Sequence, residues 1–217
     1  GGVVLPRWGA PSAGSAAELL IQLSHTYEGT LDIVAIGPLT NIARALDLDP
    51  SLTERVRSLT VMGGAVWTAG NITAHAEANI ANDPAAAAVV LDAGFATTLV
   101  PLDVTLDHGF TDAEAHTLQG RGDDLSTALG MMLTRYIDFY ETVDDERFAP
   151  LHDPLAAAIA TSDVEVTGAA STAVDVCQDG DETGRCTASS SGPAVRVVTA
   201  AHPGARQAIL DRLGPDP

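Results

Sequence analysis

Short apolar runs alternate with amphipathic segments along most of the chain. The runs at 31–36, 59–62 and 96–102 predict buried strands, because they are short and bounded by turn residues. Apolar positions at helical spacing predict helices at 16–23, after Asn41 as far as Leu46, and at 85–91, 113–119, 125–144, 155–160 and 204–213. Further strands are predicted near the C-terminus, at 165–167, 173–176 and 194–198. The alternation predicts an α/β fold, in which helices cover both faces of a doubly wound, mostly parallel sheet.

No linker or internal repeat divides the chain, so we expect one domain over residues 1–217. The longest predicted helix, 125–144, carries a regular apolar stripe. Its members are Leu129, Met132, Leu133, Tyr136, Ile137 and Tyr140. We interpret this stripe as core or subunit contact in preference to a cofactor-binding surface.

Composition narrows the classes of function. The hydrophobic content of 46% with 18% charged residues is typical of a folded domain. A formal net charge of -18 argues against nucleic acid and anionic membranes as partners, since both attract basic surfaces. No apolar run reaches the ~20 residues needed to span a bilayer. Because no signal peptide is visible, we expect a cytoplasmic protein, and because Gly1 is not Met, we expect the natural N-terminus upstream.

Two cysteines, Cys177 and Cys186, flank a polar turn. They can close a hairpin disulfide or remain free thiols in a reducing compartment, and the absence of a secretion signal favours free thiols. A metal site is not expected there, since no second pair of Cys or His lies nearby.

A polar segment follows the strand 59–62. It contains Asn71, Glu77 and Asn79, whose amide and carboxylate groups suit the hydroxyls of a polyol. The alternative is a solvated loop in which these side chains cap turns.

A second candidate is His152-Asp153-Pro154, where an imidazole and a carboxylate can supply a proton donor and a metal ligand. The alternative is that Asp153 only caps a helix that starts with Pro154. A dyad of this kind also occurs in helical HD-type metal phosphohydrolases, but the branched strand runs argue against that fold.

Taken together, several motifs resemble the nucleoside hydrolases of the inosine–uridine-preferring type. They are Ala35-Ile-Gly-Pro-Leu-Thr-Asn-Ile-Ala43, Val61-Met-Gly-Gly64, Gly70-Asn71, Ala76-Glu-Ala-Asn79, Asp83-Pro-Ala-Ala86, Pro101-Leu-Asp-Val-Thr105 and Leu151-His-Asp-Pro-Leu155. Their order and spacing agree with the family from about residue 1 to 213. The resemblance implies a Rossmann-like nucleoside hydrolase fold, one bound Ca²⁺, and hydrolysis of ribonucleosides to ribose and free base through an oxocarbenium-like transition state.

The resemblance also implies roles for individual residues. Asn71, Glu77 and Asn79 match the residues that bind ribose hydroxyls, and Met62 is expected beneath the sugar. Asp153 matches a calcium ligand near the ribose, and Ile36 matches the residue whose backbone carbonyl binds the metal. His152 matches the acid that protonates a leaving purine. Ala78 departs from the pattern, because the family often has an aromatic residue there.

One family feature is absent from the sequence, the Asp-rich motif of type D-x-D-x-x-x-D-D. The resemblance implies that this motif, which supplies most calcium ligands and the general base, precedes Gly1 together with the first strand. We therefore expect an N-terminally truncated hydrolase that forms dimers or tetramers when complete. The alternative is a catalytically inactive fragment or binding module that retains the ribose loop.

Overall fold

A six-stranded sheet runs through the centre of the computed structural model, which describes residues 13–144 and 146–213. The strand order is β1-β2-β3-β8-β6-β7. Four neighbouring strands are parallel: β1 (Leu31–Ala35), β2 (Val56–Met62), β3 (Thr97–Val100) and β8 (Val195–Ala201). The other two, β6 (Val166–Val176) and β7 (Cys186–Ser189), run antiparallel to their neighbours. The sheet is therefore mostly parallel, as the sequence predicted.

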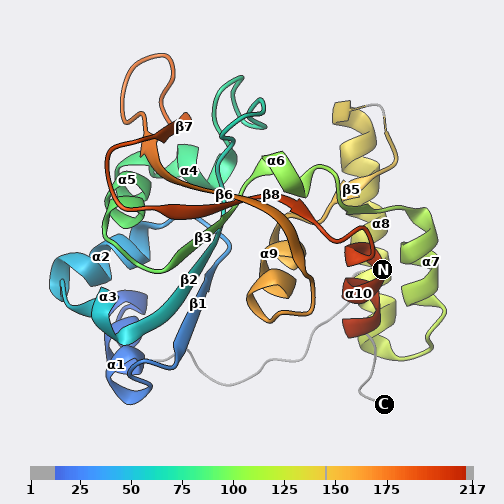
Figure 1. Ribbon diagram of the computed structural model, residues 1–217. Coiled ribbons are helices and arrows are strands. Elements are labelled where there is room, and N and C mark those ends of the chain that lie inside the picture. The colour runs from blue at the N-terminus through green and yellow to red at the C-terminus, as the bar shows by residue number, and fades with distance from the viewer. Residues whose placement is uncertain (1–12, 145, 214–217) are drawn as a thin grey trace.

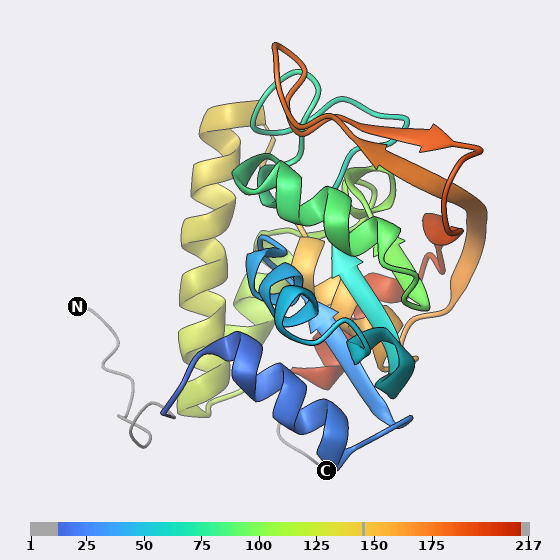
Figure 2. The ribbon, with the colours of Figure 1, turned by 90° about the vertical axis from the view of Figure 1, so that its left-hand side faces the viewer.

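Helices cover both faces of this sheet (Figure 1). On one face lie α1 (Ala16–Thr26), α2 (Thr40–Leu48) and α5 (Pro84–Asp92), which stand in front of the sheet in Figure 2. On the other lie α9 (His152–Ala160) and α10 (Ala205–Arg212). Each face has its own buried core: Ile33, Leu59 and Val90 belong to the first, and Val100 and Leu155 to the second. The two cores confirm the doubly wound α/β class.

The remaining elements extend this framework. Short helices follow or precede strands: α3 (Leu52–Arg55), α4 (Ala78–Asn82) and α6 (Leu102–Thr105). Beyond α9, the helices α7 (Asp112–Gln119) and α8 (Asp124–Asp144) pack on each other, next to the two-stranded sheet of β4 (Gly109–Phe110) and β5 (Ala149–Pro150) (Figure 1). No helix among the described residues is long and apolar enough to cross a membrane. The parallel sheet also rules out the helical HD-type alternative.

Both cysteines are free thiols, so the hairpin disulfide is not formed. Cys186 pairs with Val176, while the N–H of Cys177 donates to the carbonyl of Arg185, 3.0 Å away. The two cysteines are thus one residue out of register, and successive residues of a strand face opposite sides. Cys186 is buried, and burial raises the pKa of its thiol to about 12.

Candidate functional site

The carboxyl ends of the parallel strands meet at one edge of the sheet, as they must when neighbouring strands share a direction. Ile36 directly follows β1, and Met62 is the last residue of β2. A cavity of about 950 Å³ opens at this edge. It is lined by all seven residues that the sequence singled out: Ile36, Met62, Asn71, Glu77, Asn79, His152 and Asp153. The structure therefore brings the predicted site residues together, although they span more than half of the chain.

Glu77 is tied to the backbone around the cavity. It is the N-cap of α4, and its side chain is only 2% exposed. Its carboxylate accepts N–H bonds from Gly64 at 2.9 Å, Asn79 at 2.8 Å and Ile80 at 3.1 Å. A carboxylate has about four lone-pair positions, so about one remains for a ligand. The sequence analysis treated capping and ligand binding as alternatives for this segment. Glu77 both caps α4 and lines the cavity.

The two asparagines each present one free end of their amide. Asn79 donates through Nδ2 to the carbonyl and sulfur of Met62, at 3.1 and 3.3 Å. Its Oδ1 has no partner among the described residues. Asn71 accepts the N–H of Ala78 through Oδ1 at 3.0 Å, which leaves its Nδ2 without a described partner. The two asparagines thus offer the cavity one acceptor and one donor that have no partner among the described residues.

His152 lies between two hydroxyl groups. Its Nδ1 is 2.7 Å from Oγ1 of Thr105, and its Nε2 is 3.2 Å from the hydroxyl of Tyr140. Thr105 is fully buried, so its hydroxyl fixes the orientation of the ring. Burial lowers the pKa of His152 to about 4, so the imidazole is neutral at pH 7. A protonated His152 at neutral pH would therefore require a further group to stabilise the cation.

Asp153 does not cap its helix. The N-cap of α9 is Leu151, and Asp153 stands in the first turn, so the capping interpretation is wrong. Its carboxylate has no hydrogen bond or ion pair with any described residue, and partial burial raises its pKa. A half-buried carboxylate that has no partner in the described part of the chain is suited to a cation or a hydroxyl donor from outside.

The wall of the cavity formed by α8 was not foreseen as part of the site. Ile137 is fully buried, but Met132 is 62% exposed and Tyr136 is 42% exposed, and both line the cavity together with Tyr140. The apolar stripe therefore divides between packing and the cavity wall. The helical spacing showed the stripe but not which part of it would be left uncovered.

The described residues do not by themselves make a calcium site. No group of three or more His, Cys, Asp or Glu side chains among them is placed to hold a metal ion. Asp153 and the backbone at Ile36 offer two oxygen donors, whereas Ca²⁺ takes 6–8. Residues 1–12, which precede the described part of the chain, contain no Asp or Glu.

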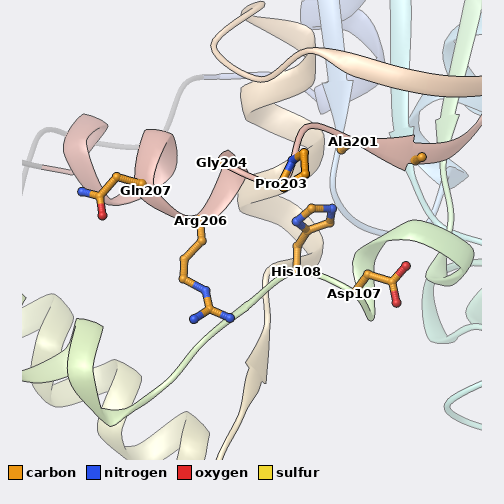
Figure 3. A pocket seen from close by; sticks show the side chains of 8 residues that line it. Asp107, His108, Ala201, Pro203, Gly204, Arg206 and Gln207 are labelled. Atoms are coloured by element: carbon orange, nitrogen blue, oxygen red, sulfur yellow. The ribbon is translucent and has the colours of Figure 1, made fainter.

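A second cavity, of about 500 Å³, lies between the start of α10 and the turn before β4. Figure 3 shows His108 beside Pro203, with Arg206 extending from the first turn of α10. Arg206 lies 3.8 Å from Glu114, and burial lowers the pKa of His108. None of the residues predicted from the sequence lines this cavity.

The fold and the larger cavity define an α/β protein with a polar site at the carboxyl ends of parallel strands. The family model described as inosine-uridine preferring nucleoside hydrolase matches residues 1–206, so the chain belongs to this family. It is 35% identical over 142 residues to a probable uridine nucleosidase 1 of Oryza sativa subsp. japonica, covering 65% of this chain and 44% of that protein. It is 34% identical over 149 residues to a pyrimidine-specific ribonucleoside hydrolase of Salmonella schwarzengrund, covering 67% of this chain and 47% of that protein.

Solved structures of nucleoside hydrolases match a larger share of this chain than the curated relatives do. A plant nucleoside hydrolase superposes with a TM-score of 0.90 at 26% identity, covering 97% of this chain and 70% of the other. A purine-preferring ribonucleoside hydrolase of Gardnerella vaginalis superposes with a TM-score of 0.87 at 29% identity, covering 96% and 67%. The chain spans less than half the length of the curated relatives that it matches.

Proposed function

We propose that the protein hydrolyses the N-glycosidic bond of ribonucleosides at the cavity beside Met62, Asn79 and His152. Water would add its hydroxyl to the anomeric carbon, and the base would leave with the proton. The single observation that supports this most is the gathering of the seven predicted residues around one cavity in a chain of the nucleoside hydrolase family.

The free amide ends give the ribose a place to bind. A ribose hydroxyl both donates and accepts, so it can donate to Oδ1 of Asn79 or accept from Nδ2 of Asn71. Met62, 2% exposed and held by Asn79, provides the apolar floor under the sugar. Glu77 contributes at most one lone pair to the ligand, and its larger part is to hold the backbone of Gly64 and α4 in place.

His152 and Asp153 are the groups best placed for the reacting bond. In the oxocarbenium-like transition state the sugar becomes positive and the base negative. The free carboxylate of Asp153 stabilises positive charge on the sugar, and an N–H or O–H from the His152–Tyr140 pair can bond to the leaving base. Since the pKa of His152 is about 4, full proton transfer from it is favoured only at acidic pH or after substrate binding raises that pKa.

We propose that this chain supplies part of a calcium site, through the carboxylate of Asp153 and the backbone carbonyl of Ile36. The remaining ligands must come from outside the described residues. Accordingly, we expect this chain alone to bind Ca²⁺ weakly, with a Kd above about 1 mM, as measured by isothermal titration calorimetry. Micromolar binding that Asp153→Ala does not weaken would contradict this assignment.

A binding module without chemistry is the second candidate. It is favoured by one observation: of the two carboxylates on the cavity, Glu77 is occupied by three backbone N–H groups, which leaves Asp153 alone. Activation of a water molecule needs a base, and Asp153 is also needed near the sugar. A module of this kind would bind ribonucleosides without releasing base.

Chromatographic measurement of the base released from inosine and from uridine tests the proposed function. We expect Asn79→Ala to lower kcat/KM about a hundredfold, because it removes a fixed ribose contact. Asn82→Ala is the matched control, since Asn82 lies on the same short helix and its side chain bonds, among the residues that the structure describes, to the carbonyl of Ala78 alone. Binding without base release would favour the second candidate, and equal kinetics for the two variants would remove Asn79 from the site.

A further inference from the structure

The turn between β6 and β7, residues 177–185, lies against the segment that carries the ribose-binding residues. Figures 1 and 2 show it at the same end of the molecule as the β2–α4 loop, residues 63–77. Arg185 pairs with Ala76 as an isolated antiparallel bridge. Ala76 is fully buried and directly precedes Glu77. Segments more than a hundred residues apart in sequence are thus joined beside the cavity.

Gly184 makes the closest approach of this turn to the loop. Its φ is +85°, and an added Cβ would lie 2.9 Å from Cβ of Ala76 and 2.9 Å from Cα of Ala81 in α4. Real Cβ atoms do not come this close to backbone atoms, so any side chain at 184 must displace the loop or α4. Glycine is therefore required here both by the backbone conformation and by the contact.

Cys186 touches the other end of the same loop. It is 2% exposed, and its sulfur lies 3.2 Å from the position that a Cβ on Gly64 would take. The N–H of Gly64 is one of the three donors to Glu77. The hairpin therefore packs on both sides of Glu77, against residue 76 before it and against the peptide that binds its carboxylate.

The turn is itself held in shape. Arg185 forms an ion pair with Glu182 at 2.6 Å, the N–H of Gly184 donates to the carbonyl of Cys177 at 2.7 Å, and the hydroxyl of Thr183 donates to the carbonyl of Gly180 at 2.6 Å. By contrast, residues 67–75 lack regular structure and are largely exposed. A turn that is held by its own hydrogen bonds and ion pair can fix the position of the irregular loop beside it.

We propose that the β6–β7 turn, together with Cys186 at the start of β7, positions the ribose-binding segment, residues 63–79, and that Gly184 and Cys186 are the positioning residues. They touch no substrate, and they act by setting where Asn71, Glu77 and Asn79 stand relative to the cavity. The proposal rests on the proposed function for its catalytic consequence, but its structural part can be tested without activity.

Gly184→Ala tests the proposal, with Gly180→Ala as a matched control. Gly180 has a similar φ of +79° in the same turn, but nothing lies within 4 Å of an added Cβ. Both variants carry the same kind of backbone strain, and only Gly184→Ala pushes on Ala76. We expect Gly184→Ala to shift the side-chain amide signals of Asn71 and Asn79 in ¹H–¹⁵N spectra, and Gly180→Ala to leave them in place. The amide of Gln207, bonded to Asp211 on α10, serves as a distant reference.

The hydrolysis assay is run at a temperature at which Gly184→Ala is folded. We expect the variant to lower kcat/KM at least about tenfold, since a small misplacement of contacts suffices for that loss. Should Gly184→Ala not fold, Cys186→Ala decides, because it removes the sulfur beside Gly64 without a clash. Unchanged Asn71 and Asn79 signals in the folded variant would overturn the proposal. If the wild-type protein releases no base, the proposed function fails, and the amide signals still decide the role of the turn.

Discussion

At the scale of single residues, side chains that line the cavity also form hydrogen bonds that hold its walls in place. Glu77 caps α4 and lines the cavity, and Asn79 supports Met62 while keeping one oxygen free. The sequence predicted that these residues belong to one site, and the structure brings them to the same cavity. It did not foresee Thr105 and Tyr140 on either side of His152, since this contact joins three elements that only the fold brings together.

The lowered pKa of His152 predicts a loss of stability in mild acid. In the unfolded chain the pKa returns to about 6.5, so the unfolded state binds more protons between pH 6.5 and 4. The contribution of His152 to the free energy of unfolding is fully present above pH 6.5. It falls by up to about 3 kcal/mol as the pH drops toward 4. The raised pKa of Asp153 acts in the opposite direction, because its folded form takes up a proton first.

Urea unfolding of wild-type protein and of His152→Gln at pH 7 and pH 5 measures this effect. We expect the variant to lose less stability than the wild type between the two pH values. His116→Gln, an exchange on α7 outside the cavity, is the control and should follow the wild type. A wild-type protein whose pH dependence equals that of His152→Gln would refute the assigned cause.

At the scale of elements, the sequence predicted long elements well and short ones poorly. The strands β1 and β2 and the helices α5, α7, α8 and α9 fall where periodicity placed them, apart from their ends. The sequence predicted a polar loop from Asn71 to Asn79, but the helix α4 begins at Ala78, because Ala78–Asn82 has too few residues for a periodic pattern. The runs at 165–167 and 173–176 are one long strand, β6, whose alternating burial weakens the apolar signal between them.

The packing of α8 on α7 depends on a glycine in mid-helix. An added Cβ at Gly130 would lie 2.7 Å from the carbonyl oxygen of Ala115 and 2.7 Å from Cγ of Gln119, both on α7. Helix propensity alone favours Ala over Gly by about 1 kcal/mol. The clash should outweigh this, so that Gly130→Ala lowers the free energy of unfolding by about 1–3 kcal/mol.

Denaturant unfolding measures whether Gly130→Ala lowers or raises the free energy of unfolding. The near-ultraviolet circular dichroism of Tyr136 and Tyr140 reports on the cavity wall. Thr127→Ala, one turn earlier on α8, is the control and should be neutral or mildly stabilising. A stabilised Gly130→Ala protein would show that the helices have room to separate.

At the scale of the whole molecule, the sheet ends at β1 within the described residues. Val34 on this strand is 38% exposed, and Ile36 beside it is 52% exposed. An uncovered apolar edge strand pairs readily with other chains. Assembly into dimers or tetramers, a cytoplasmic location and a single domain over residues 1–217 remain predictions from the sequence.

The exposed edge predicts concentration-dependent self-association of this chain. Val34→Lys should reduce it, because a charge on an edge strand opposes pairing with a neighbour. Val89→Lys is the control, as Val89 is 53% exposed on α5, away from the edge. Sedimentation velocity over a range of concentrations measures the effect. A wild-type chain that stays monomeric throughout would contradict it.

We expect a ribonucleoside to bind in the cavity beside Met62, Asn79 and His152. Titration of ¹⁵N-labelled protein with uridine, followed in ¹H–¹⁵N spectra, tests it most directly. We expect shifts at the side-chain amides of Asn71 and Asn79 and at the ring of His152. Shifts confined to His108 and Arg206 at the second cavity, or no shifts at millimolar uridine, would contradict it.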